Sequence, residues 1–223
     1  MSFFSIFKMT IPVLMGYIPL GMAFGLLLSK LLIPWYYAFF MSLFIFAGAG
    51  QFLVLALFAS QATILEIGVA IFLLNLRHTF YGLSMLSTLK KFSWKKHYII
   101  FGLTDETFAL LKTNDVKEEE RERVYLIITA LNQSYWIVGS VIGAVLGNIV
   151  PFDYRGIEFS LTALFVVLSI DLYNKSRQHK PFLISIVIGF VGMLAFPSDK
   201  MLILSLSLAA VVLILFKKAL EDG

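Results

Sequence analysis

The sequence predicts an all-α integral membrane protein with about seven transmembrane helices, one short re-entrant or interfacial helix, and a first helix broken at proline and glycine. Of its 223 residues, 59% are hydrophobic and only 14% are charged, whereas about a quarter of the residues in soluble domains are charged. Apolar runs long enough to cross a bilayer, which takes about 20 helical residues, follow one another along the chain. Basic residues gather in the short loops between these runs, which is typical of membrane topology signals rather than of nucleic-acid binding.

The expected spans follow the apolar runs in order: residues 10–29, 36–59, 64–89, 124–150, 156–173, 181–197 and 201–216. The shorter stretch 97–111 carries two adjacent acids, and its placement decides the topology. If it does not span, one side of the membrane receives Lys90, Lys91, Lys95, Lys96, Lys112, Lys117, Arg121, Arg123, Lys175, Arg177, Lys180, Lys217 and Lys218.

Only Lys8, Arg155 and Lys200 then remain on the opposite side. Because positively charged loops favour the cytoplasm, we expect seven spans, an outside N-terminus and a cytoplasmic C-terminus. Residues 1–223 would form a single polytopic domain. Residues 90–123 would be a cytoplasmic-side segment that contains the re-entrant or interfacial stretch 97–111.

The first span is interrupted by prolines and glycines. Pro19 has no N–H to donate to the Met15 carbonyl, which leaves that oxygen free at membrane depth. Broken helices in transporters expose such carbonyls, and half-helix N-termini, to substrate or ions. The alternative is a proline kink beside a Gly21-x-x-x-Gly25 packing face.

The second span places small residues beside a buried amide. Gly48 and Gly50 allow close helix approach, and Gln51 needs a hydrogen-bond partner in hydrocarbon. Both a structural bond between helices and a contact with substrate fit this pattern. In the fourth span, glycine recurs every fourth residue and indicates close helix packing: Gly139, Gly143 and Gly147.

The third span holds the least expected polar group of the chain. Arg77 lies near the centre of the span, where a charge costs about 2.5–3.5 kcal/mol on insertion scales. Helical spacing puts Asn75 and His78 on one stripe, and Arg77 and Tyr81 on the adjoining one. This wide polar sector predicts a substrate or proton site that faces the protein interior. A structural ion pair between two helices is the other interpretation.

Asp105 and Glu106 supply the nearest opposite charges. If 97–111 dips into the membrane, either acid can pair with Arg77 or His78. A carboxylate and a histidine at membrane depth are also the usual parts of a proton relay. Alternatively, the two acids only cap an interfacial turn.

The motifs of common enzymes are missing from the sequence. It has neither the H-E-x-x-H zinc motif nor the G-x-S-x-G nucleophile motif, and no glycine-rich phosphate loop with lysine. With no cysteine and three histidines, a structural metal site is not expected. We therefore predict no catalytic residues, no metal and no cofactor.

Four segments resemble the AzlC family, the large subunit of bacterial branched-chain amino acid exporters, in the order and spacing of that family. The first two are Gly-Tyr-Ile-Pro-Leu-Gly-Met-Ala-Phe-Gly (16–25) and Phe-Ala-Gly-Ala-Gly-Gln-Phe (46–52). The others are Asn-Leu-Arg-His-Thr-Phe-Tyr-Gly (75–82) and Leu-Thr-Asp-Glu-Thr-Phe-Ala (103–109). The helix around Trp136 also resembles its counterpart, whereas a glycine stands at position 50 where the family often has serine.

The resemblance implies secondary-active export of leucine, isoleucine, valine and analogues across a bacterial cell membrane, with energy from a proton or ion gradient. It also implies a small membrane partner, AzlD, and the glycine-lined helix faces suggest where such a subunit could associate. It supplies no established substrate-binding residues, so the site residues rest on their own chemistry. The alternative is a non-transporting membrane subunit or sensor whose partner forms the pathway.

Overall fold

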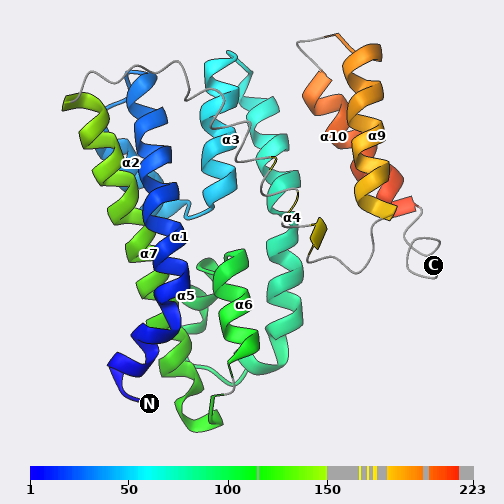
Figure 1. The fold of residues 1–223 in the computed structure, drawn as a ribbon. Helices are drawn as coiled ribbons and strands as arrows, with labels where there is room; N and C mark the ends of the chain where they lie inside the picture. Colours follow the sequence, from blue (N-terminus) through cyan, green and yellow to red (C-terminus); the bar gives the residue numbers. More distant parts are fainter. Residues whose placement is uncertain are drawn as a thin grey trace. The chain divides into compact units, whose positions relative to one another are not determined.

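The computed structural model describes residues 1–114, 116–149, 166, 170, 173–174, 180–197 and 201–215. All regular elements within these residues are helices (Figure 1). The chain divides into two compact units: Met1–Ala56 with Asn75–Asp153 forms unit 1, and Leu57–Leu74 with Tyr154–Gly223 forms unit 2. The prediction of an all-helical protein is therefore confirmed for the described part of the chain.

Helix α1 (Phe3–Lys30) is continuous, which corrects the prediction of a break in the first span. Pro12 and Pro19 both lie inside it, and the side chains of both are exposed. A proline removes one hydrogen bond and bends a helix, but neighbouring helices can hold such a helix together. Here α1 packs along α7 (Glu118–Ile149), and these two helices run side by side in Figure 1.

Glycines bring the backbones of α1 and α7 into contact. A Cβ on Gly21 would lie 2.9 Å from the Ser140 backbone nitrogen, and one on Gly139 would lie 2.7 Å from the Ile18 carbonyl oxygen. A Cβ on Gly143 would overlap the Met22 carbonyl oxygen. The prediction of close packing is therefore confirmed, and the suggestion that these glycines receive a partner subunit is wrong, because α1 of the same chain occupies them.

The break predicted for the first span lies instead in the second. Helix α2 (Trp35–Phe44) is capped by Ile45, and α3 (Gly48–Ala59) begins three residues after this cap. Phe46, between them, has φ of 41°, in the left-handed region that disfavours residues with a Cβ. Phe46 is buried and stacks edge-on against Tyr17 with ring centroids 6.4 Å apart, so packing stabilises the unusual backbone.

A second interruption follows α4 (Ile64–Leu89) in the chain. The stretch 97–111 forms two short helices, α5 (Lys96–Phe101) and α6 (Asp105–Thr113), separated by residues 102–104. Gly102 lies against both Phe46 and Thr129, so a Cβ there would meet the Thr129 methyl group. Within unit 1 the two interrupted helix pairs therefore contact each other through Phe46 and Gly102.

Among the described residues, three helices are long and apolar enough to cross a membrane: Phe3–Lys30, Ile64–Leu89 and Glu118–Ile149. They correspond to the predicted spans 10–29, 64–89 and 124–150. In unit 2, α9 (Lys180–Ala195) packs against α10 (Met201–Leu215), where the sequence predicts the last two spans. The predicted span 156–173 lies outside the described residues except for residues 166, 170 and 173.

Candidate substrate site

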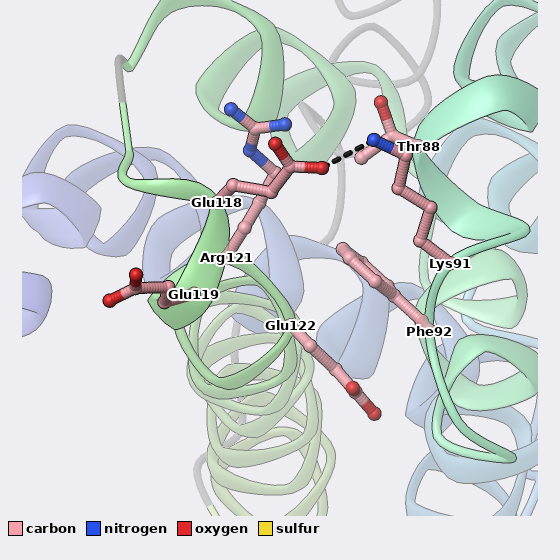
Figure 2. Close-up of a pocket in the computed structure, with 7 residues that line it drawn as sticks. All are labelled: Thr88, Lys91, Phe92, Glu118, Glu119, Arg121 and Glu122. Carbon is pink, nitrogen blue, oxygen red and sulfur yellow. Dashed lines mark hydrogen bonds and ion pairs between the residues drawn. The ribbon is translucent and has the colours of Figure 1, made fainter.

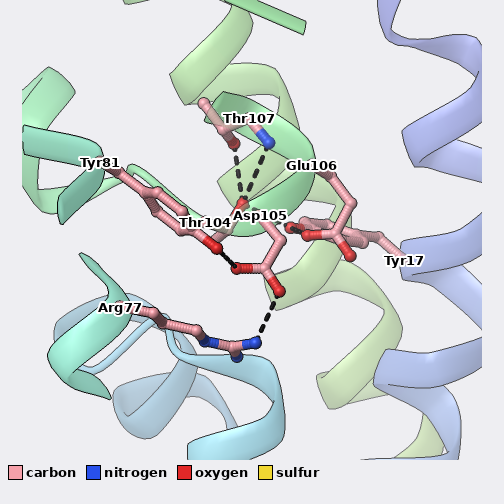
Figure 3. Close-up of polar contacts among 7 residues, drawn as sticks. All are labelled: Tyr17, Arg77, Tyr81, Thr104, Asp105, Glu106 and Thr107. Atoms are coloured by element: carbon pink, nitrogen blue, oxygen red, sulfur yellow. Dashed lines mark hydrogen bonds and ion pairs between the residues drawn. The ribbon is translucent and has the colours of Figure 1, made fainter. Parts of the chain in front are cut away.

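An ion pair joins α4 to the start of α6, as Figure 3 shows. Nη1 of Arg77 lies 2.7 Å from Oδ2 of Asp105. The Tyr81 hydroxyl, one helical turn after Arg77, donates a hydrogen bond of 2.8 Å to Oδ1 of the same carboxylate. Both oxygens of Asp105 therefore have a donor, and the predicted pairing of Arg77 with one of the two acids is present in the structure.

The local sequence explains why the acids lie where they do. Thr104 caps α6, and its hydroxyl accepts a hydrogen bond of 3.3 Å from the Thr107 backbone N–H. Asp105 and Glu106 fill the first turn, where the positive end of the helix dipole stabilises negative charge. Consecutive helical residues point about 100° apart, so the two acids face different neighbours.

Glu106 points toward α1, and Asp105 points toward α4 (Figure 3). The Tyr17 hydroxyl lies 2.7 Å from Oε2 of Glu106 and also 2.7 Å from the Thr104 hydroxyl. Thr104 is in turn 2.9 Å from the Thr107 hydroxyl. One acid thus contacts a cation and the other joins a chain of neutral hydroxyl groups.

Helix α7 adds three polar side chains, each of which binds a different element. Nδ2 of Asn132 donates to the Thr107 hydroxyl at 3.0 Å, and Nε2 of Gln133 donates to the Leu43 carbonyl at the end of α2 at 2.8 Å. Nε1 of Trp136 donates to Oε1 of Gln51 at 2.8 Å. Gln51, which the sequence marked as a candidate substrate contact, therefore has a structural bond to another helix.

The beginning of α3 lies against both α7 and α4. A Cβ on Gly48 would lie 3.3 Å from the Trp136 ring, and one on Gly50 would lie 3.6 Å from Nδ2 of Asn75. The two glycines thus let an indole and an amide approach the helix start closely. This arrangement brings Gly50 near Asn75, and Gly48 and Gln51 near Trp136, all within unit 1.

Three buried polar atoms around this site have no hydrogen-bond partner among the described residues. They are Oδ1 of Asn75, Nε of Arg77 and Oδ1 of Asn132, whose side chain is 0% exposed. A buried polar atom without a partner costs about 1–3 kcal/mol. These atoms are therefore available to a ligand or to water.

The remaining predicted site residues lie elsewhere. Met15 is 69% exposed and Pro19 is also exposed, so both side chains lie on the surface of unit 1. His78 is half-buried and contacts the Tyr81 ring edge-on at 5.7 Å. The structure thus brings His78 against Tyr81, whereas the role expected of the Met15 carbonyl beside Pro19 stays a prediction.

A separate polar depression of about 180 Å³ lies where α7 begins (Figure 2). Its walls carry charges of both signs, and Lys91 contacts Glu118 there. Both side chains are largely exposed, and such surface pairs contribute little to stability. A ligand with an aliphatic side chain would find only Phe92 as a large apolar wall, so we do not assign the substrate to this depression.

Several residues of the cluster were not singled out by the sequence analysis: Tyr17, Thr104, Thr107, Asn132 and Gln133. Asn132 and Gln133 could have been found from the sequence, because they are two adjacent amide side chains inside an apolar span. Tyr17 gives no signal of its own, because a tyrosine in an apolar helix is equally common in packing and in membrane interfaces.

Comparison with known proteins gives consistent matches. The family model described as AzlC protein matches residues 12–150. The chain is 41% identical to an uncharacterized membrane protein of Helicobacter pylori over 99% of this chain and 97% of that protein. It is 31% identical to the branched-chain amino acid transport protein AzlC of Bacillus subtilis, over 100% of this chain and 88% of that protein.

It is also 31% identical to the inner membrane protein YgaZ of Escherichia coli, over 84% of this chain and 78% of that protein. No solved structure matches. The family model covers more than half of the chain, and the relatives extend the match over nearly all of it. The resemblance inferred from the four motifs is therefore confirmed, and the chain belongs to the AzlC family of membrane transport proteins.

Proposed function

We propose that this chain is the large subunit of a two-component secondary exporter for leucine, isoleucine, valine and their analogues. The single observation that supports this best is the Arg77–Asp105 ion pair, at the N-terminus of a helix in an interrupted pair. Charged groups within spanning segments of transporters mark substrate and ion pathways. The name of the Bacillus subtilis relative supports branched-chain amino acids as the substrate class.

The unpartnered atoms of α4 suit a zwitterion. Nε of Arg77 is a donor for a carboxylate, and Oδ1 of Asn75 is an acceptor for an ammonium group. The first N–H groups of α3, at Gly48 and Gly50, add donors on the positive end of a helix dipole. Trp136 and Phe46, both buried nearby, offer apolar surface to an aliphatic side chain.

The membrane arrangement in this proposal has seven spans in the inner or plasma membrane, with residues 90–123 on the cytoplasmic side. The observed pair of short helices α5 and α6 suits a re-entrant segment, because its interrupted backbone is covered by α1 and α7. A proton or ion gradient supplies the energy, and a small subunit resembling AzlD completes the transporter.

The decisive experiment measures efflux of labelled leucine from proteoliposomes. The chain is reconstituted alone, with its small partner, and with a partner-only control. We expect efflux above the control only when both proteins share a membrane. Full efflux from the chain alone would refute the two-component proposal, and efflux from the partner alone would favour a non-transporting role for this chain.

A further inference from the structure

We propose that the two adjacent acids of α6 have different tasks, and that Glu106 is the group that takes up and releases the coupling proton while Asp105 keeps its charge. This inference rests on the proposed function, since it names the proton site of the same transporter. The observation behind it is that the two acids share one helical turn but differ in their partners: Asp105 contacts the Arg77 cation, and Glu106 contacts the neutral Tyr17 hydroxyl.

Both carboxylate oxygens of Asp105 already have a partner. A guanidinium nitrogen of Arg77 lies 2.7 Å from one oxygen, and the Tyr81 hydroxyl lies 2.8 Å from the other. Protonating Asp105 would leave the Arg77 charge without its partner, and breaking a pair of this kind is costly. Asp105 and Arg77 therefore behave as one neutral unit.

Glu106 has a single protein partner among the described residues, the neutral Tyr17 hydroxyl. In the re-entrant arrangement proposed above, a carboxylate without a cation beside it is neutralised most easily by a proton. Its side chain is also exposed, so protons from outside unit 1 can reach it. Around the start of α6 the other charged or titratable contacts belong to Asp105 (Arg77 and Tyr81 of α4), and α7 contributes the neutral Asn132.

The hydroxyl chain behind Glu106 can respond to its protonation. When Glu106 is ionised, the Tyr17 O–H donates to the carboxylate, so the Tyr17 oxygen can accept the hydrogen that Thr104 otherwise donates to Thr107. When Glu106 carries a proton, it can donate to Tyr17, and every hydroxyl in the chain can turn the other way. The proton enters and leaves only at Glu106, and no other group loses one.

The far end of the chain is Asn132. Its Nδ2 bonds to Thr107, and its Oδ1 is buried without a partner among the described residues. If the hydroxyl groups reverse, Thr107 has a hydrogen to donate, and the Asn132 amide can rotate to accept it. The unpartnered atom of Asn132 then changes from an acceptor to a donor. Protonation of Glu106 would thereby alter what the buried interior offers to a ligand.

The test separates exchange from driven transport. Proteoliposomes with the chain and its small partner are loaded with leucine, and labelled leucine exchange at equal pH is compared with efflux driven by a pH gradient. The Glu106→Gln side chain imitates the protonated acid. We expect Glu106→Gln to lower the rate of driven efflux at least about tenfold, which corresponds to the loss of one charge-assisted hydrogen bond. The rate of exchange should stay within about threefold of wild type.

The control is Glu119→Gln, which removes an exposed acid at the start of α7 and should leave both rates unchanged. Tyr17→Phe keeps the ring contact with Trp136 but removes the hydroxyl, so it should shift the pH profile of driven efflux. Wild-type driven efflux in Glu106→Gln overturns the proposal. Loss of exchange along with driven efflux, in a protein that still folds, overturns it too, because Glu106 would then serve binding or structure.

A measurement without substrate keeps the inference distinct from the proposed function. Infrared difference spectra of the purified protein at acid and alkaline pH report the C=O stretch of protonated carboxyl groups. We expect one such band to vanish in Glu106→Gln and to remain in Glu119→Gln. An unchanged band overturns the proton site, whereas absence of any leucine exchange in the wild-type protein would refute only the proposed function.

Discussion

Removing the Arg77 guanidinium tests the site most directly. In Arg77→Ala the Asp105 carboxylate keeps the Tyr81 hydrogen bond but loses its only cation among the described residues. Hydrogen bonds to charged groups contribute about 1.5–3 kcal/mol, and breaking a fully buried pair costs about 3–5 kcal/mol. The side chains are 34% and 36% exposed in unit 1, so we expect a loss of stability near the lower figure, about 2 kcal/mol.

The loss of transport should exceed any loss of folded protein in the membrane. If Arg77 binds the substrate carboxylate, its loss removes a charge-assisted contact, and efflux should fall by about a hundredfold, since each tenfold corresponds to about 1.4 kcal/mol. Labelled leucine efflux is measured together with the amount of protein in the membrane. Asp105→Asn should abolish efflux as well, while membrane expression stays largely intact.

Two control variants distinguish a substrate site from a structural pair. Arg77→Lys keeps the charge and can form the single hydrogen bond that Nη1 makes, so it should retain part of the activity. The double variant Arg77→Gln with Asp105→Asn removes both charges and any unpaired charge. Normal efflux in that double variant would show that the pair only holds α4 to α6, and wild-type efflux in Arg77→Ala would rule out the site.

Three further predictions concern packing and topology. Gly143→Ala should destabilise the detergent-solubilised protein by about 1–3 kcal/mol, because the added Cβ overlaps α1. Gly16→Ala has open space around its Cβ and should leave stability unchanged, so equal melting temperatures of the two variants would contradict this prediction. Trp136→Phe should cost about 1–3 kcal/mol in the same assay, because a buried amide oxygen loses its donor. Lys95→Cys and Lys117→Cys should both resist an impermeant external thiol reagent; labelling of only one would show that 97–111 spans.

Much of the helical pattern could be predicted because apolar length alone determines it. The third span was expected at 64–89, and α4 has these bounds. The position of the break could not be predicted in this way. Pro19 lies on an exposed face of a helix that α7 supports along its other side, so it does not interrupt the helix. The left-handed Phe46 depends on contacts with Tyr17 and Phe101, which are distant in sequence.

The polar cluster was predictable where a charge stood out against an apolar background. Arg77 and Asp105 were recognised because charge inside a span is costly and needs compensation. Which of the two acids, Asp105 or Glu106, pairs with Arg77 was not predictable, since it depends on which helix lies on each side of α6. The role of the glycines at 139 and 143 needed the structure for the same reason: a small-residue face shows that something packs closely, and not which helix does so.

The contacts of α7 suggest how the parts of unit 1 divide into support and movable elements. The backbones of α1 and α7 touch at Gly21, Gly139 and Gly143, so neither helix can slide past the other without a clash. The interrupted pairs instead contact α7 through side-chain hydrogen bonds and packed side chains: Gln133 bonds to α2, Trp136 to α3, and Asn132 and Tyr125 to α6. A hydrogen bond of this kind contributes about 1 kcal/mol and is readily exchanged for a bond to a ligand or water. We therefore expect α1 and α7 to remain fixed during transport, and the breaks at 45–47 and 102–104 to be the places where the backbone moves.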